Sequence, residues 1–227
     1  MEIINRGSEW NKWDLHIHTP HTKKEDNYVT SNDSRDVWDK YITELENSDI
    51  KVFGITDYFS LDNYYYLKNQ QDNNGRLQGK ILLPNVELRI FPVAKHGNAI
   101  NIHVIFDPKM DRKDIEREFF SNLKMNSTSG NEYRCIKEDL IAYGKELKRE
   151  NYQDDDTPIR EAISKFCVNY EEIFKIISKP IFKNRSLIAV SNTSKDGVSG
   201  LQTTGGNLDQ IRTNIYQQYL VKFSIYV

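Results

Sequence analysis

The sequence predicts an α/β fold in which parallel strands alternate with helices and form a TIM-like barrel. Apolar, strand-like runs alternate along the first half of the chain with segments of helical spacing, as in β-α units. Four of these runs also carry a histidine or a carboxylate near one end. In a parallel barrel such side chains meet at the C-terminal face, where the sites of this architecture lie. We therefore expect one site that is built from several strand ends.

The first predicted strand, at residues 13–19 (WDLHIHT), carries the most specific pattern in the chain. Asp14, His16 and His18 alternate with apolar residues, so an extended chain places all three on one face. Two imidazoles at this spacing can face one metal ion, and a carboxylate beside them can fix an imidazole tautomer. The alternative is a histidine-rich strand end that is solvated or hydrogen-bonded in the core. The alternation favours the metal site.

Three further strands are expected in the first half of the chain. A helix over 34–46 leads to a mostly apolar strand at 51–57. A helix over 61–71 precedes the strand at 81–90, and another strand follows at 99–106. The polar residues that these strands contribute to the expected site are Asp57, Glu87 and His103. Arg89 is expected on the face of Glu87, in a surface ion pair or, alternatively, against a substrate phosphate.

The second half is expected to form a helical insertion over about 111–180, with helices over 111–125, 136–148 and 157–178. A strand is expected to follow at 186–191. Apolar residues recur there at helical spacing with charges between them, which is typical of helices that pack beside a sheet. Glycine-rich stretches then precede a helix over 208–219 and a last strand over 220–227. We interpret these stretches as ordinary connections, because the Walker A pattern of a phosphate-binding loop is absent.

Composition places the chain among globular proteins of one domain. Its 227 residues include 33 acidic and 31 basic side chains, a formal net charge of -2, so its overall field does not direct it to nucleic acid. The two cysteines form no CxxC pair, and we expect buried thiols in a reducing compartment. No run approaches the roughly 18 apolar residues of a membrane span, and no signal peptide is evident. A cytoplasmic protein without a membrane partner is expected.

Four segments resemble the successive motifs of the PHP (polymerase and histidinol phosphatase) domain family. They are residues 13–19 (WDLHIHT), 54–58 (GITDY), 86–88 (VEL) and 101–103 (NIH). Residues 6–10 (RGSEW), 58–59 (YF) and 196–201 (DGVSGL) are similar to the TrlF-type subgroup, in which a PHP domain precedes an SMC- or RecF-like ATPase. The chain resembles the PHP part alone, so we expect a single domain over 1–227, no ATPase domain, and such an ATPase as a partner.

The resemblance implies a distorted (β/α)7 TIM-like barrel that hydrolyses phosphate esters, as a phosphodiesterase or nuclease-type enzyme acting on nucleic acid. Residue by residue, the metal ligands that it implies are His16, His18, Glu87 and His103. Two or three divalent ions are expected, and this ligand set suits Zn, Mn or Fe. The expected catalytic residues are Asp57, which matches the second-motif aspartate, and Asp14, which would fix a histidine tautomer.

Two departures from the family pattern favour competing hypotheses. Tyr58 stands where most PHP enzymes have a histidine, and a phenol with a pKa near 10 is a poorer ligand than imidazole. No histidine follows His103, so the later histidine motifs are missing and the barrel is expected to be incomplete at its C-terminal end. One competitor is a catalytically impaired module that binds nucleic acid or docks onto an SMC-like ATPase. Another is a structural α/β domain that binds nothing.

Overall fold

The computed structural model describes residues 10–24, 28, 34–91 and 100–189. Its first half consists of strands and helices in the order β1 (Lys12–His18), α1 (Ser34–Asn47), β2 (Ile50–Tyr58), α2 (Asp62–Asn73), β3 (Ile81–Phe91) and β4 (Ile100–Phe106). These elements agree closely with the expected strands and helices of this half. The predicted α/β class is therefore confirmed.

The second half contains short elements of both kinds. They are α3 (Arg112–Glu118), the 3-10 turn η1 (Phe120–Asn122), β5 (Lys124–Asn126), β6 (Glu132–Arg134), α4 (Lys137–Lys148), α5 (Asp156–Lys165), β7 (Val168–Asn169), α6 (Tyr170–Ile177) and β8 (Ser186–Ala189). The predicted glycine-rich connections and the last helix and strand lie outside the described residues.

The main sheet is mixed, and the prediction of parallel units throughout is wrong for its second half. Its strand order is β1-β2-β3-β4-β8, with β7 paired to β3. The first three strands are parallel, but β4 runs antiparallel to β3, and β8 runs antiparallel to β4. Residues 92–99, between β3 and β4, are too few for a helical crossover, which needs a dozen or more. Within the described residues the sheet is open from β1 to β8, and no closed barrel is seen.

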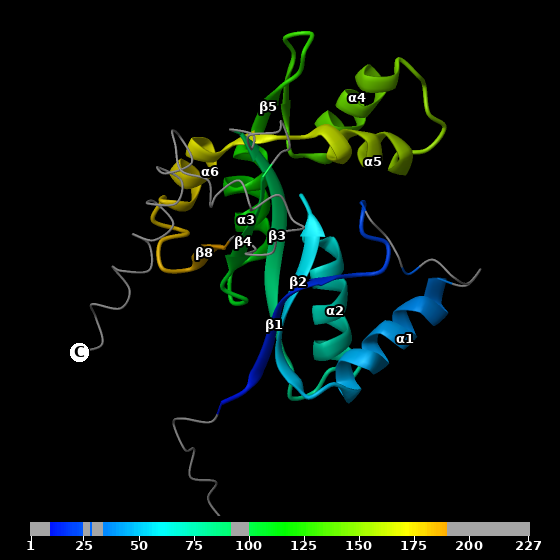
Figure 1. Ribbon diagram of the computed structural model, residues 1–227, viewed down its shortest axis with the longest axis vertical. Helices are drawn as coiled ribbons and strands as arrows, with labels where there is room; N and C mark the ends of the chain where they lie inside the picture. The colour runs from blue at the N-terminus through cyan, green and yellow to red at the C-terminus, as the bar shows by residue number, and fades with distance from the viewer. Residues whose placement is uncertain (1–9, 25–27, 29–33, 92–99, 190–227) are drawn as a thin grey trace, which may run out of the picture.

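The helices cover different parts of the sheet (Figure 1). α2 lies beside β2 with α1 tilted next to it, whereas α4 and α5 lie together beyond one end of the strands. The expected helix over residues 111–125 is shorter than predicted, because α3 ends at Glu118 and the antiparallel β5 and β6 follow. The expected helix over 157–178 is divided by β7, whose Val168 pairs with Ile90 of β3. Pairing with a distant strand has overridden local helical periodicity here.

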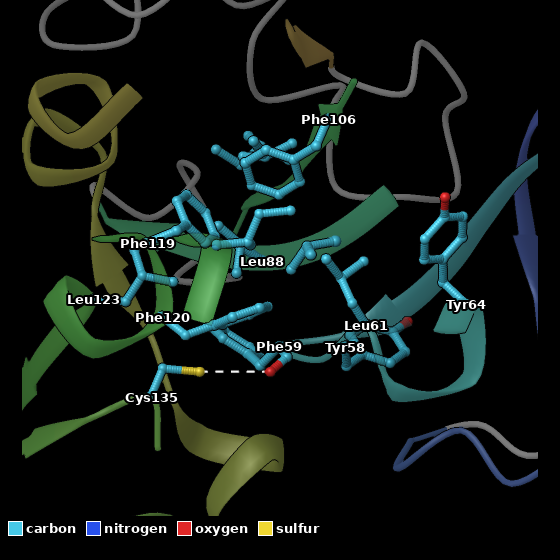
Figure 2. Close-up of a cluster of buried hydrophobic side chains, with 14 of the residues drawn as sticks. Tyr58, Phe59, Leu61, Tyr64, Leu88, Phe106, Phe119, Phe120, Leu123 and Cys135 are labelled. Carbon is cyan, nitrogen blue, oxygen red and sulfur yellow. Dashed lines mark hydrogen bonds between the residues drawn. The ribbon is translucent and has the colours of Figure 1, made fainter. Parts of the chain in front are cut away.

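The core joins side chains of the sheet with those of α1 and α2 and of the helices of the second half. Figure 2 shows Leu88 of β3 and Phe106 of β4 packed with Phe119, Phe120 and Leu123. Both cysteines are free and buried, as predicted. Across the described residues, no helix has the length and apolar character to cross a membrane.

Candidate metal centre

An irregularity in β1 decides which side chains of the WDLHIHT segment share a face. Asp14 pairs with Phe53, but the next pair is Ile17 with Ile55, so β1 uses three residues where β2 uses two. An extra residue reverses the alternation of side chains along a strand. Asp14 therefore lies on the face of Phe53, and His18, which pairs with Thr56, lies on the other. The prediction that Asp14 shares the face of both histidines is wrong.

Asp14 and Gly54 support this bulge locally. The Asp14 carboxylate accepts a hydrogen bond from the backbone N–H of His16 at 3.1 Å, so its observed contact is with the backbone and not with an imidazole. The carbonyl oxygen of Leu15 passes so close to Gly54 that a Cβ at this position would lie 2.2 Å from it. Only glycine allows the two backbones to approach in this way.

Three imidazoles and one carboxylate meet beside the bulge. His16 Nε2 lies 3.4 Å and His18 Nε2 3.2 Å from Glu87 Oε2, and the two Nε2 atoms are 3.1 Å apart. Glu87 is directly opposite His103 in the β3–β4 register, and the His16 and His103 rings have centroids 4.4 Å apart. Ligand atoms of His16, Glu87 and His103 all lie within 4.8 Å of one another. The four residues expected as metal ligands are thus brought together.

The Glu87 carboxylate has the environment of a metal ligand. Its side chain is almost fully buried, and Oε1 accepts a hydrogen bond from Asn101 Nδ2 at 2.8 Å. Oε2 is buried without a well-formed hydrogen bond, although it faces two imidazole nitrogens. Burial alone would raise the pKa of Glu87, but the neighbouring imidazoles of His16, His18 and His103 outweigh it and hold this pKa well below its usual range. An anionic oxygen that faces imidazole nitrogens suits a divalent cation.

Asn85 connects the bulge to His103 and was not identified from the sequence. Its fully buried side chain donates from Nδ2 to the Leu15 carbonyl at 2.7 Å and to Thr56 Oγ1 at 2.9 Å. Its Oδ1 lies 3.3 Å from His103 Nδ1. Because both amide hydrogens are used, Oδ1 is the acceptor, which places the His103 proton on Nδ1 and leaves Nε2 for an ion. A polar residue within an apolar strand, two positions before Glu87, was the available signal.

Asp57 lies outside the cluster. Tyr58, and not Asp57, pairs with Glu87, so strand alternation directs Asp57 to the opposite face of the sheet. There its carboxylate accepts a hydrogen bond from Thr19 Oγ1 at 2.8 Å, and Asn63 donates to the same hydroxyl at 2.8 Å. Burial raises the pKa of Asp57 to about 6. The structure therefore does not bring this expected catalytic residue to the expected ligands.

Tyr58 borders the cluster and is surrounded by basic side chains. Its ring stacks on His18 with centroids 5.1 Å apart, and Lys24 Nζ lies 5.3 Å from the ring centroid. The Arg89 guanidinium is 5.7 Å from the same centroid. Arg89 is only 8% exposed and donates to the backbone carbonyls of Ile163, at 3.0 Å, and Ser164. It is therefore not the surface ion pair that the sequence predicted.

Comparison with known proteins adds no family assignment. No protein-family model matches the chain, and a search of curated proteins found no match. The geometry offers nitrogen and oxygen ligands around a buried anionic carboxylate, which is the chemistry of a divalent metal site.

Proposed function

We propose that this chain is a metal-dependent phosphoric ester hydrolase that cleaves phosphodiesters of nucleic acid. The observation that supports it most is the convergence of His16, His18 and His103 on the buried Glu87 carboxylate. Within this class, the four motifs favour a PHP-type domain of the TrlF-like subgroup, with a distorted (β/α)7 barrel. A cytoplasmic location and an SMC- or RecF-like ATPase partner belong to the same proposal.

The four clustered residues would hold a divalent ion, and Zn, Mn or Fe each suit them. Such ions supply Lewis acidity toward a phosphoryl oxygen and lower the pKa of water toward about 7. Among the described residues one ligand group is found, so it supports one ion. The resemblance to PHP domains implies a second and possibly a third ion. Their ligands would have to come from outside the described part of the chain.

The protein's own residues prepare this site before any ion binds. Glu87 is anionic at neutral pH because its pKa is held low, so no carboxyl proton has to be displaced. Asn101 fixes one carboxylate oxygen of Glu87, which leaves Oε2 directed at the imidazoles. Asn85 fixes the ring of His103 and, through the Leu15 carbonyl, the bulge that carries His16.

A second candidate function is a catalytically impaired module that binds nucleic acid or docks onto an ATPase. Tyr58 favours it, because its ring occupies the border of the cluster by stacking on His18, where most PHP enzymes have an additional imidazole ligand. Metal binding is common to both candidates, whereas hydrolysis separates them. A chain that binds metal but cleaves no phosphodiester would support the module.

The test is elemental analysis of protein purified without chelator, followed by hydrolysis assays on bis(p-nitrophenyl) phosphate and single-stranded oligonucleotides. We expect near-stoichiometric Zn, Mn or Fe and measurable hydrolysis, both lost in the double variant His16→Ala/His18→Ala. His21→Ala is the matched control, because His21 contacts Trp38 and lies outside the ligand group. A folded wild-type chain that holds no metal after reconstitution would contradict the proposal. It would favour the hypothesis of a structural α/β domain that binds nothing.

A further inference from the structure

A row of apolar side chains crosses the sheet on the same face as the ligand cluster. Trp13 of β1 pairs with Val52 of β2, and Val52 pairs with Ile81 of β3. Residues that pair across parallel strands point to one face, and every second residue along a strand returns to that face. Val52 is an even number of positions from Tyr58, and Tyr58 pairs with Glu87. The row therefore shares the face of the Glu87 carboxylate.

The outer residues of this row are open to solvent. Trp13 is 63% exposed and Ile81 is 54% exposed, whereas Val52 between them is buried. The core cluster that α1 and α2 share with the sheet contains Phe53, on the opposite face, but none of the three residues of the row. Single exposed apolar residues are ordinary, but a contiguous group of them marks a surface that binds something.

The floor between this row and the ligand cluster is neutral. On that face of β2 and β3, the intervening pairs are Gly54 with Leu83 and Thr56 with Asn85. None of these side chains carries a charge, so the floor does not repel the phosphates of a nucleic-acid strand. An anionic backbone can therefore lie along the floor from the cluster to the row.

Both ends of the floor are accessible from β1. The His16 side chain is 36% exposed, so the ligand cluster is open to solvent on this strand. Trp13 and His18 pair with Val52 and Thr56, and this separation along β2 corresponds to about 13 Å. A nucleic-acid strand advances about 3.4 Å per nucleotide in B-form and more when it is extended. A strand with one phosphate at the cluster therefore brings a base to Trp13 within about four nucleotides.

The exposed indole selects the kind of nucleic acid. Indole presents a flat π face, and bases of every type stack on such a ring. In a duplex the base faces are already stacked on their neighbours, whereas the bases of a single strand can turn outward and stack on an aromatic side chain. Only an unpaired strand can offer a base to Trp13.

We propose that Trp13 is the base-stacking residue of a binding site for single-stranded nucleic acid that leads to the ligand cluster. The inference rests on the proposed hydrolase function for the position of the phosphate, and it names an unpaired strand as the substrate. Ile81 extends the apolar surface beside the stacked base.

The first test uses the tryptophan itself as the reporter. The double variant Trp10→Phe/Trp38→Phe leaves Trp13 as the one tryptophan of the chain. Titration with oligo(dT) or oligo(rU) in EDTA should quench its fluorescence to saturation, because stacking places a base against the indole. A duplex of the same length and inorganic polyphosphate offer no unpaired base and should not quench it. Acrylamide should quench Trp13 in the free protein, since the ring is exposed.

The second test measures the contribution of the ring by fluorescence anisotropy of labelled oligo(dT), again in EDTA. Trp13→Ala should weaken binding about 5- to 100-fold, and Trp13→Phe should weaken it less, because a phenyl ring still stacks. Tyr66→Ala is the matched control, since Tyr66 is also an exposed aromatic residue but lies on α2 and contacts Trp38 of α1. Circular dichroism checks that each variant folds.

Three results would overturn the inference. They are the absence of saturable quenching, equal binding of oligo(dT) by Trp13→Ala and the wild type, and a Trp13 fluorescence that acrylamide cannot reach because other residues cover the ring. A dimer in sedimentation that Trp13→Ala converts to a monomer would also overturn it, by assigning the row to a contact between two copies.

The two proposals fail separately. All of these titrations contain EDTA, so a chain that cannot bind metal contradicts the hydrolase proposal without obscuring the result for Trp13. A chain that cleaves bis(p-nitrophenyl) phosphate but does not bind oligo(dT) contradicts the inference and leaves the hydrolase proposal standing.

Discussion

Glu87 and Asp57 are two buried carboxylates on neighbouring strands, yet their pKa values move in opposite directions. Both are nearly inaccessible, with 2% and 4% of their surfaces exposed. Glu87 faces the imidazoles of His16, His18 and His103, and its pKa is held below the usual range. Asp57 faces the Thr19 hydroxyl on the other side of the sheet, and burial raises its pKa to about 6.

The difference shows that the chemistry of the neighbours, and not burial, decides the charge of an interior carboxylate. Burial opposes the charged form of both groups. Three imidazoles overcome that penalty at Glu87, whereas neutral hydrogen-bond donors reduce it only in part at Asp57. A carboxylate that stays anionic against burial is ready to hold a cation, whereas one with a raised pKa must release its proton before it can bind one below that pKa.

The largest effect is expected from Glu87→Gln, which removes the anion and keeps the shape. Metal affinity should fall by about 10³-fold or more, because Glu87 is the one negative charge in the ligand group that the described residues form. Titration with Mn²⁺ or Zn²⁺ in competition with a chelator measures this. Because the pKa of Glu87 is lowered in the folded state, its charge stabilises the wild type above about pH 4.3, and this stability is lost on acidification. The free energy of unfolding of the neutral variant should therefore depend less on pH in the acidic range. Unchanged metal affinity would remove Glu87 from the site.

Gly54→Ala should disrupt the close approach of β1 and β2 that supports the bulge in β1. This bulge places Asp14 and His18 on opposite faces of the sheet. The new Cβ would meet the Leu15 carbonyl at 2.2 Å, and a backbone atom cannot move aside as a flexible side chain can. We expect a loss of about 3 kcal/mol in the free energy of unfolding, by urea denaturation, together with weaker metal binding as the bulge shifts His16. Gly79→Ala, at a turn with φ of 74° and nothing near its Cβ, is the comparison for a glycine replaced without a clash, and its left-handed backbone should cost about 1–2 kcal/mol. Equal losses for the two variants would contradict a specific role of the bulge.

Asp57→Asn should leave metal affinity unchanged but alter the pH dependence of stability. A raised pKa means that the native state binds the proton more tightly, so charged Asp57 destabilises the fold above about pH 6, and this penalty vanishes below about pH 4. A shift of about two pKa units corresponds to at most about 3 kcal/mol. The variant should therefore gain stability relative to the wild type as the pH rises from 4 to 7, in urea denaturation at several pH values. A constant difference across that range would disprove the raised pKa.

Asn85→Ala should weaken metal binding less than Glu87→Gln does. It removes the acceptor that orients His103 and the donor that holds the Leu15 carbonyl, while all four expected ligands remain. Loss of such supporting hydrogen bonds typically weakens metal binding about 10- to 100-fold. Thr56→Val is the control, because it removes one partner of Asn85 and leaves the contact with His103. If both variants bind metal equally well, Asn85 does not orient His103.

The sequence was sufficient to locate the four residues that cluster in the structure, but not to place Asp14 and Asp57. Alternation in residues 13–19 and one polar residue on each later strand identified His16, His18, Glu87 and His103, because strand periodicity is local. The same alternation placed Asp14 beside the histidines, which is wrong, because the bulge that reverses it arises from pairing with β2. Asp57 was expected at the site because it lies near a strand end. The register of β2 and β3 instead places Asp57 and Glu87 on opposite faces of the sheet.

By itself, the sequence determined the α/β class, the bounds of the early strands and helices, and the residues with metal-ligand chemistry. The tertiary structure decided the antiparallel course of β4, the division of the helical insertion by β7, the role of Asn85 and the exposed position of Trp13 on the face of the ligand cluster. The physical reason is the range of the interactions. Side-chain periodicity acts over a few residues and can be read along the chain, whereas strand register and the exposure of a side chain depend on contacts between residues far apart in sequence.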